Sequence, residues 1–499
     1  MPGADATPAK PGNRHWSEMV PARDGVRLAT NVHLPDGAGP FPVILERTPY
    51  GRDQISRSEV TVANPVPITR TELAVYFTAH GYAVVFQDNR GRHGSEGVFV
   101  KYLSDGDDGY DCCAWIVAQD WCDGRICTMG LSYAAHTQAA LGCLDAPGVV
   151  AQVLDSGGFA DAWRGGIRQW GAFELKQATW AHKQAILSPE AEADPVMKAA
   201  LEAEDIRDWF TRMPWQQGHS PLRHHPAYEA YLFDQWRHGA FDAYWQQVGI
   251  WAEGFHARYS MADCVHMSSW YDAYPLTATA NYLGLRKAER GPQRLILGPW
   301  THGDRSRTVF GDVDFGSDAA IDAWAGDWRQ YRLRHFDSVI KGLPNPEPAV
   351  RLFMMGGGSG RKTAAGHLAH GGHWLRFADW PPPDSVATAY HLQPAGLLDP
   401  APPARTRSRY PSTSTLLTPC QPSAAPSPAW NPWPPAAPGT RSNPPNSSAA
   451  PPPTFHSPPG PTCWCSKPRP SPRPPASSAP SPPPCSSPPT APTPISPPN

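Results

Sequence analysis

The chain has 499 residues, with 43 Lys and Arg against 45 Asp and Glu, and its formal net charge is −2. This length allows two or three domains, and both signs of charge are spread through the first 400 residues, which excludes a basic surface for nucleic acid or for an acidic membrane. No apolar run reaches the roughly 20 residues that a membrane-spanning helix needs.

The start of the chain and its cysteines both favour a cytoplasmic protein. Residues 1–15 are polar and rich in Pro, Gly and Ala, which predicts a disordered lead-in rather than a secretory signal. Six of the 10 cysteines lie before residue 300, and none of them forms a C-x-x-C pair: Cys112, Cys113, Cys122, Cys127, Cys143 and Cys264. Reduced thiols explain them better than a metal or redox site. We therefore expect no metal and no cofactor.

The first part of the chain alternates strands and helices. Residues 16–35 alternate polar and apolar side chains around Arg23-Asp24-Gly25, which is typical of a hairpin. Buried strands are then predicted at 41–47, 82–87, 126–129 and 149–154, and helices at 71–79, 107–118 and 134–141. Continuous apolar strands separated by helices predict a parallel sheet that is covered on both faces.

Ser132 lies in a tight turn, Gly130-Leu131-Ser132-Tyr133, between a predicted strand and a predicted helix. A serine in such a turn presents its hydroxyl above the sheet edge, next to a helix N-terminus that favours negative charge. Ala134 stands where the G-x-S-x-G motif has its second glycine. Gly-x-Ser turns are often only structural, so the motif alone leaves a nucleophilic and a structural role open.

Residues 156–257 have helical spacing and a high density of tryptophan, without strand-like runs. A helical insertion at this point of a hydrolase sheet predicts a cap over the site. We expect its aromatic side chains to form the core of the cap rather than the wall of a substrate pocket.

The sheet resumes after the cap and supplies an acid and a base. A strand at 264–267 leads to Asp272, and a strand at 293–297 leads to His302. The chain order Ser, Asp, His is the order of an α/β-hydrolase triad. Position at the strand ends favours these two residues over the other candidates of the same types: Asp155, Asp263, His136 and His266.

Several stretches, in a fixed order between about 16 and 410, resemble the CocE/NonD hydrolases, a group of esterases, acylases and X-Pro dipeptidyl-peptidases. They are Arg47-Thr48-Pro49-Tyr50, Gln87-Asp88-Asn89-Arg90-Gly91, Ser95-Glu96-Gly97, Asp108-Gly109-Tyr110-Asp111, Gln119-Asp120-Trp121-Cys122-Asp123-Gly124, Gly130-Leu131-Ser132-Tyr133, Trp270-Tyr271-Asp272 and Gly298-Pro299-Trp300-Thr301-His302. Together they are highly specific.

The resemblance implies a catalytic triad. Ser132 would be the nucleophile, His302 the general base and then acid, and Asp272 the carboxylate that orients the imidazolium. It also implies an oxyanion hole formed by the backbone N–H of Tyr133 and the hydroxyl of Tyr50.

Other positions carry weaker expectations. Trp270 is a candidate for the wall of the acyl pocket, and we expect Asp88 and Arg90 to form a structural ion pair. Cys127 and Ala135 stand where the family usually has glycine, and we expect mild repacking there rather than loss of the turn.

The predicted organisation is an α/β-hydrolase fold with a helical cap, a truncated β-sandwich and a tail. Residues 322–342 are predicted to form one amphipathic helix, and a new β-rich segment is expected to open at about 348. The ranges are 1–15 for the lead-in, 16–155 and 258–345 for the hydrolase domain, 156–257 for the cap, 346–410 for the start of a jelly-roll sandwich, and 411–499 for the tail.

The tail, 411–499, has the composition of a disordered segment. No Asp or Glu follows Asp399, and about half of the 61 prolines lie beyond residue 410. Residues 411–425 and 461–469 can both be back-translated so that the frame starting two nucleotides later encodes acidic segments like those of the family's sandwich. We therefore hypothesise a frameshift near Tyr410; the alternative is a genuine Pro/Ser-rich interaction tail with polyproline II character.

The sequence thus favours a serine hydrolase that cleaves an ester or amide bond of a small acyl substrate. One alternative is an X-Pro dipeptidyl-peptidase, which would need Glu174, Glu202 or Glu204 to hold a substrate ammonium group. Another is a catalytically impaired truncated product, or a scaffold whose tail recruits SH3-like partners. The oligomeric state stays open, and a homo-oligomer is one possibility.

Overall fold

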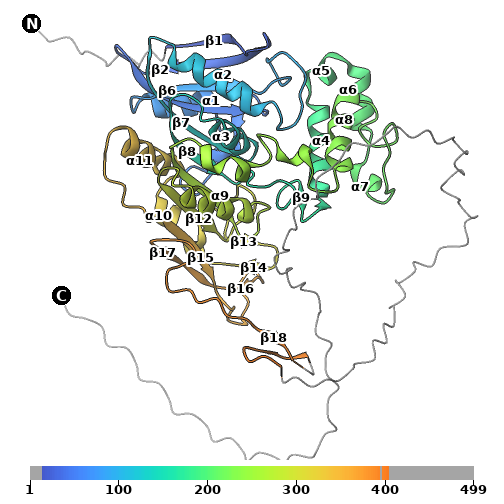
Figure 1. The fold of residues 1–499 in the computed structure, drawn as a ribbon, viewed down its shortest axis with the longest axis vertical. Helices are drawn as coiled ribbons and strands as arrows, with labels where there is room; N and C mark the ends of the chain where they lie inside the picture. The colour runs from blue at the N-terminus through green and yellow to red at the C-terminus, as the bar shows by residue number, and fades with distance from the viewer. Residues whose placement is uncertain (1–13, 394–395, 404–499) are drawn as a thin grey trace, which may run out of the picture. The chain divides into compact units, whose positions relative to one another are not determined.

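The computed structural model describes residues 14–393 and 396–403, which are built around one ten-stranded sheet (Figure 1). Its strand order is β1-β2-β6-β3-β7-β8-β11-β12-β15-β17. The strands are β1 (Arg14–Pro21), β2 (Arg27–Leu34), β3 (Phe41–Thr48), β6 (Ala83–Asp88), β7 (Cys122–Leu131), β8 (Val149–Asp155), β11 (Asp263–Ser269), β12 (Gln293–Gly298), β15 (Val350–Met355) and β17 (Gly372–Phe377). Neighbours from β6 to β15 are parallel, and both edges are antiparallel. The predicted parallel sheet is confirmed.

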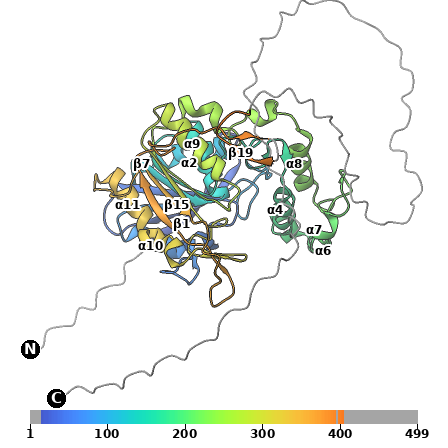
Figure 2. The ribbon, with the colours of Figure 1, turned by 90° about the horizontal axis from the view of Figure 1, so that it is seen from below.

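Helices cover both faces of this sheet. They are α1 (Arg70–Thr78), α2 (Asp105–Val117), α3 (Tyr133–Cys143), α9 (Pro275–Lys287) and α11 (Trp328–Ile340). On β3, Val43 and Leu45 pack in a cluster with α2 and α3, whereas Ile44 between them packs with α1 and α11. Successive strand side chains point to opposite faces, so all-apolar strands require two covering layers. Figure 2 shows α2 and α9 on one side of the sheet and α11 on the other.

The segment between β8 and β11 is mainly helical. It contains β9 (Arg168–Gln169), β10 (Ala172–Phe173), α4 (Leu175–Ile186), α5 (Pro189–Ala193), α6 (Pro195–Glu202), α7 (Ile206–Trp209), α8 (Pro226–Arg237) and two 3-10 helices, η2 (Ala243–Gln246) and η3 (Ala252–Arg258). The two-residue hairpin of β9 and β10 is a departure from the predicted absence of strands. Trp209, Trp215 and Trp245 are buried in the core of this segment, as predicted for most of its aromatic residues, whereas Trp170 is exposed.

The predicted helix 322–342 is two helices. The chain forms α10 (Asp322–Ala325), turns at Gly326 with φ 76°, and starts α11 after Asp327. The Asp327 carboxylate accepts a hydrogen bond from the backbone N–H of Arg329, 2.9 Å away, and so caps α11. A glycine with positive φ followed by an N-cap residue ends one helix and starts the next, which the amphipathic pattern alone does not reveal.

The strand that was expected to open a separate sandwich joins the central sheet instead. β15 pairs with β12 in parallel and β17 pairs with β15 in antiparallel register. Val350 to Phe353 are buried, so this strand is covered on both faces like its neighbours. The prediction of a sandwich from 346 is therefore wrong for Val350–Met355 and Gly372–Phe377, and for the rest of 346–410 it stays a prediction. The other short elements are β4 (Ile55–Ser56), η1 (Arg57–Glu59), β5 (Ile68–Thr69), β13 (Val309–Phe310), β14 (Val313–Asp314), η4 (Ser317–Ala319), β16 (Leu368–Ala369), β18 (His391–Leu392) and β19 (Leu398–Asp399).

Two further predictions concern the cysteines and the chain ends. The six cysteines before residue 300 are buried and free. Within residues 14–393 and 396–403, no helix is long and apolar enough to cross a membrane. Most of the predicted lead-in and all of the predicted tail lie outside the described residues.

Candidate active site

Ser132 occupies a strained position between β7 and α3. β7 ends at Leu131 and α3 begins at Tyr133, and Ser132 itself has φ 61° and ψ −114°. Non-glycine residues seldom adopt positive φ, and such strain is concentrated at functional sites. The backbone N–H of Ser132 donates to the carbonyl of Asp155 at the end of β8, 2.8 Å away. The predicted turn is therefore present, and it is anchored to the neighbouring strand.

The turn depends on glycine at position 130 but not at 134. Gly130 has φ 146°, and a Cβ there would lie 2.3 Å from the Cβ of Ala134. The methyl group of Ala134 therefore occupies the space that a side chain at position 130 would fill, and it fits because residue 130 is glycine. Ala135 is accommodated in a similar way, because a Cβ on Gly157 would lie 2.8 Å from the Ala135 Cβ. Cys127 is fully buried in the strand core, and the turn is retained.

Replacing Gly130 by alanine should destabilise the protein by about 2–6 kcal/mol, the sum of overpacking and backbone strain. Gly124→Ala is the matched control on the same strand, because Gly124 has φ 87° but nothing within 4 Å of an added Cβ. Chemical denaturation measures both free energies of unfolding. Equal losses for the two variants would contradict the close contact at Ala134.

His302 and Asp272 are hydrogen-bonded to each other. Asp272 lies in the turn after β11 and His302 in the loop after β12. His302 Nδ1 is 2.9 Å from Asp272 Oδ1. The Asp272 side chain is completely buried, whereas the His302 side chain is 42% exposed. A buried carboxylate that accepts from Nδ1–H leaves Nε2 available as a base.

Neighbouring groups fix the orientation of the Asp272 carboxylate. Its Oδ1 accepts from the backbone N–H of Ala273 at 2.6 Å, and its Oδ2 accepts from Ser268 Oγ at 3.1 Å. The histidine loop in turn lies next to the serine turn: a Cβ on Gly303 would lie 2.9 Å from Leu131 Cδ2. The residue after His302 therefore packs on the residue before Ser132.

Tyr50 adjoins Ser132 and is held by the cap. The Trp180 Nε1–H on α4 donates to the Tyr50 hydroxyl at 3.1 Å. Burial raises the pKa of Tyr50, and its hydrogen bonds with Trp180 and Ser132 oppose that rise. A protonated phenol beside Ser132 is a hydrogen-bond donor for an oxyanion. The residues around Trp180 do not predict this contact, because the folding of an insertion onto the turn leaves no signal in a local motif.

Tyr133 offers its backbone rather than its side chain to the site. Its N–H is the first of α3, where the helix has no internal acceptor for it. Its hydroxyl is buried and accepts from the backbone N–H of Tyr102 at 2.8 Å. It also hydrogen-bonds to Asp105, whose pKa burial raises to about 7. The side chain thus anchors the start of α3.

Trp270 has contacts of a packing residue. Its Nε1–H donates to the carbonyl of Phe353 on β15 at 2.8 Å, and its ring packs on a cluster that includes Leu352 and Tyr282. These contacts lie towards the last strands of the sheet. The lining of an acyl pocket by Trp270 stays a prediction.

The side chains of the other aspartates and histidines considered for the triad have other partners or lie at the far end of a strand. Asp263 lies at the start of β11, the end of the strand remote from Asp272, and His266 Nε2 is 2.8 Å from Gln293 Oε1. His136 Nδ1 accepts from the backbone N–H of Gly158 at 2.9 Å. Asp155 forms an ion pair with Arg305. Among the residues that the structure describes, no three or more His, Cys, Asp or Glu side chains are grouped so as to hold a metal ion.

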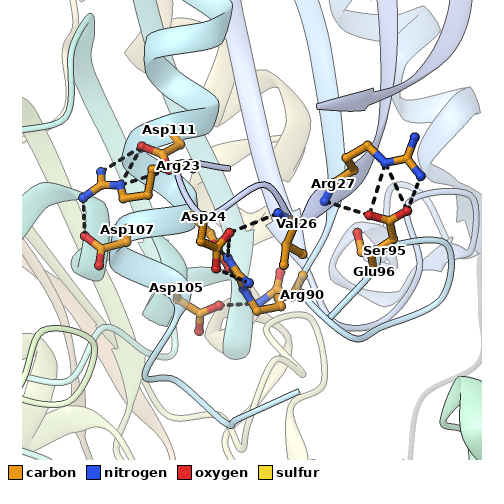
Figure 3. A network of polar contacts seen from close by, with 12 residues as sticks. Arg23, Asp24, Val26, Arg27, Arg90, Ser95, Glu96, Asp105, Asp107 and Asp111 are labelled. Carbon is orange, nitrogen blue, oxygen red and sulfur yellow. Dashed lines mark hydrogen bonds and ion pairs between the residues drawn. The ribbon is translucent and has the colours of Figure 1, made fainter. Parts of the chain in front are cut away.

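Asp88 and Arg90 do not pair with each other, which corrects the prediction. Asp88 at the end of β6 accepts from Arg52 Nη1 at 2.5 Å. Arg90 reaches Asp24 of the first hairpin at 2.7 Å and Asp108 of α2 at 2.6 Å. Figure 3 shows Arg90 with Asp24 in this network. β6 ends at Asp88, and the turn that follows directs Arg90 away from it.

A family model decides the relationship of the chain. The model of the X-Pro dipeptidyl-peptidase (S15) family matches residues 24–304, a range that includes Ser132, Asp272 and His302. The chain belongs to this family.

Curated relatives are esterases. Cocaine esterase of Rhodococcus sp. (strain MB1 Bresler) is 29% identical over 393 residues, which are 76% of this chain and 62% of the esterase. A putative serine esterase of Mycobacterium tuberculosis (strain CDC 1551 / Oshkosh) is 36% identical over 138 residues, 26% of this chain and 22% of that protein. The chain therefore spans less than two thirds of the length of cocaine esterase.

Solved structures share the fold. An aminopeptidase of a Thaumarchaeota archaeon from marine sediment has a TM-score of 0.58 at 21% identity, covering 81% of this chain and 66% of that one. An α-amino acid ester hydrolase has a TM-score of 0.54 at 21% identity, with coverages of 81% and 65%. A CocE/NonD hydrolase of Staphylococcus aureus has a TM-score of 0.51 at 18% identity, with coverages of 77% and 59%. The predicted α/β-hydrolase fold and the CocE/NonD resemblance are confirmed.

Proposed function

We propose that the protein hydrolyses an ester or amide bond of a small acyl substrate through a covalent acyl-enzyme on Ser132. The observation that carries this proposal is the hydrogen bond between His302 and the buried Asp272, in a loop that packs on the turn of Ser132. The same arrangement of a serine, a histidine and a carboxylate supports acyl transfer on unrelated folds.

In the first half-reaction, Ser132 Oγ attacks the carbonyl carbon and its proton passes to Nε2 of His302. Asp272 holds Nδ1–H and stabilises the imidazolium that forms. The backbone N–H of Tyr133 and the hydroxyl of Tyr50 donate to the oxyanion of the tetrahedral intermediate. The leaving alcohol or amine takes the proton from His302 as the acyl-enzyme forms.

In the second half-reaction, water attacks the acyl carbon and gives a proton to His302. The second tetrahedral intermediate then collapses, the Ser132 oxygen regains its proton from the imidazolium, and the carboxylic acid is released. Each proton that His302 accepts is returned, so the cycle restores the starting enzyme.

The contacts of the cap acids favour an ester or amide without an α-ammonium group over an X-Pro dipeptide. Glu204 accepts from Trp209 Nε1–H at 2.6 Å and is paired with Arg223. Glu174 lies 2.6 Å from the ammonium of Lys176. A carboxylate that is already paired with a cation attracts a substrate ammonium less strongly. Glu202, at the end of α6, is exposed.

Comparing two substrates tests this choice. We expect the purified protein to hydrolyse a neutral aryl ester with a higher kcat/KM than an X-Pro-anilide. A preference for the X-Pro-anilide would favour the dipeptidyl-peptidase instead, and Glu174→Gln would then be expected to raise KM for that substrate.

Tyr50→Phe should lower kcat by about 10²–10³-fold with little change in KM, because the hydroxyl is assigned to the oxyanion rather than to the bound substrate. Tyr82→Phe is the matched control, since the Tyr82 hydroxyl donates to Asp337 Oδ1 at 2.7 Å near the start of β6. Steady-state hydrolysis of the aryl ester measures both. An unchanged kcat in Tyr50→Phe would remove Tyr50 from the oxyanion hole.

A further inference from the structure

Asp155 and Arg305 form a buried ion pair that takes no part in the proposed chemistry. Asp155 adjoins Ser132, and Arg305 adjoins the part of the chain that carries His302. Asp155 is the last residue of β8, and Arg305 lies in the loop that carries His302. Both residues are almost completely buried. Arg305 Nη2 donates to Asp155 Oδ2, and Arg305 Nη1 donates to the backbone carbonyl of Ser58. The guanidinium is thus held from two sides.

Asp155 connects the histidine loop to the serine turn. Its backbone carbonyl accepts the N–H of Ser132 at 2.8 Å. Its carboxylate binds Arg305 and also accepts from Ser156 Oγ at 3.1 Å. One residue therefore fixes the backbone of the proposed nucleophile with its main chain and the loop of the proposed base with its side chain.

Arg305 is a principal anchor of that loop. The chain turns at Gly303 with φ 77°, and the carbonyl of Arg305 accepts from the backbone N–H of Ile321 at 2.9 Å. The His302 side chain is 42% exposed, so its position depends on its bond to Asp272 and on the backbone of the loop. A shift of the loop would move the imidazole relative to Ser132 without breaking the bond to Asp272 at once.

The environment of Arg305 is charged and aromatic. Its guanidinium lies 4.7 Å from the centre of the Trp328 ring, and that of Arg332 lies 5.3 Å from the same ring. Arg332 is itself paired with the buried Glu59. Two buried ion pairs and one tryptophan thus hold the loop that carries His302 at the position of Arg305.

Stability alone does not account for the pair. Burying two charges costs desolvation energy that a close ion pair does not always recover, and a well-packed apolar pair is often as stable. Burial lowers the pKa of Arg305 to about 9, which reflects that desolvation. An ion pair with directed hydrogen bonds also fixes the relative orientation of its two side chains.

We infer that Asp155 and Arg305 are positioning residues that hold the histidine loop so that the His302 imidazole faces the Ser132 hydroxyl. The inference rests on the proposed function, because it takes Ser132 and His302 to react together. Neither side chain is assigned a contact with substrate, since both act through the backbone of the two reacting residues.

Arg305→Lys and Asp155→Asn test the inference. Each should lower kcat for the aryl ester by about 10- to 100-fold, the cost of a small misplacement of reacting groups, while KM stays within about twofold. Arg351→Lys is the matched control: Arg351 pairs with Glu347 at 2.7 Å and lies 4.1 Å from the Trp324 ring centre, but on β15. It should keep the wild-type kcat.

The outcomes separate the inference from the function on which it rests. Wild-type protein that is not labelled at Ser132 by a fluorophosphonate would overturn the proposed function and the inference with it. Two results would overturn the inference alone, provided that the wild type is labelled. One is a wild-type kcat in folded Arg305→Lys and Asp155→Asn, and the other is an equal loss of kcat in Arg351→Lys. If Arg305→Lys and Asp155→Asn fail to fold, Ser156→Ala tests the inference instead, because it removes the hydrogen bond from Ser156 Oγ to the Asp155 carboxylate. A fall in kcat of about 2- to 10-fold at constant KM, the equivalent of one hydrogen bond, would support the inference. An unchanged kcat would refute it.

Discussion

Replacing Ser132 by alanine will lower kcat for the aryl ester by roughly 10⁴- to 10⁶-fold. The substitution removes the only atom that can form the acyl-enzyme in the proposed mechanism, and His302 then has no hydroxyl to deprotonate. The residual rate reflects the oxyanion donors acting on water. Steady-state kinetics at saturating substrate measure the effect, because the loss falls on kcat rather than on KM.

Ser260→Ala is the matched control for this experiment. Ser260 is buried, whereas Ser132 is half-buried, and the backbone N–H of Ser260 donates to Gly142 rather than to a residue of the site. Thermal unfolding should place both variants near the wild type, because each substitution removes one hydroxyl group and leaves the backbone N–H bond of that residue in place. Substantial activity in a folded Ser132→Ala protein would show that another residue is the nucleophile.

Asp272→Asn will lower kcat by about 10⁴-fold, although the side chain keeps its size. An asparagine in this position can donate a hydrogen bond to Nδ1 of His302, which would hold the proton on Nε2 and leave the imidazole unable to accept one from Ser132. The Ser268 hydroxyl can still donate to the amide oxygen, whereas the backbone N–H of Ala273 shares Oδ1 with His302 and would then face the amide nitrogen. The pH dependence of kcat/KM should therefore change as well as its maximum.

Asp263→Asn distinguishes this effect from the loss of any buried carboxylate. Asp263 belongs to the strand that Asp272 follows, and burial raises its pKa to about 6. It lies at the start of β11, whereas Asp272 follows the end of that strand. We expect Asp263→Asn to keep the wild-type kcat. A comparable fall in both variants would mean that Asp272 acts through the stability of the fold.

The central strands and their helices could be predicted from local pattern. β3 and β6 begin with the apolar runs 41–45 and 83–86, and α2 has three of its four acidic residues in the first turn. Such elements are specified by their own residues and by burial on both faces. Their predicted and observed ranges differ mainly at the ends.

Pairing and contact between distant segments could not be predicted in the same way. The residues of β15 show that it is a buried strand but not which strand it joins, and it extends the sheet beside β12. The residues around Arg90 do not reveal its partners. It pairs with Asp24 and Asp108 because the first hairpin packs on α2.

The residues of the candidate site likewise include some that could be predicted from the sequence and some that could not. Ser132, Asp272 and His302 follow strand ends, where sequence position has a direct spatial meaning in a parallel sheet. Trp180 and Arg305, by contrast, reach the site through the folding of the cap and of a loop, where Arg305 meets Asp155 at the end of β8. Residue type gave no sign of these contacts.

The proposed frameshift in the tail stays a hypothesis, because residues 411–499 lie outside the described part of the chain. Sequencing of the coding DNA around Tyr410 tests it. We expect a one- or two-base irregularity there, followed by codons that encode acidic segments in the shifted frame. Codons that do not encode those segments would leave the Pro/Ser-rich interaction tail as the explanation.

The most direct measurement is labelling of the purified, folded protein with a fluorophosphonate, followed by intact and peptide-level mass spectrometry. The proposed mechanism predicts one adduct per chain, on the peptide that carries Ser132, and no adduct in Ser132→Ala. An adduct on a different residue, or none on protein shown to be folded, would contradict the assignment of Ser132 as the nucleophile that His302 and Asp272 activate.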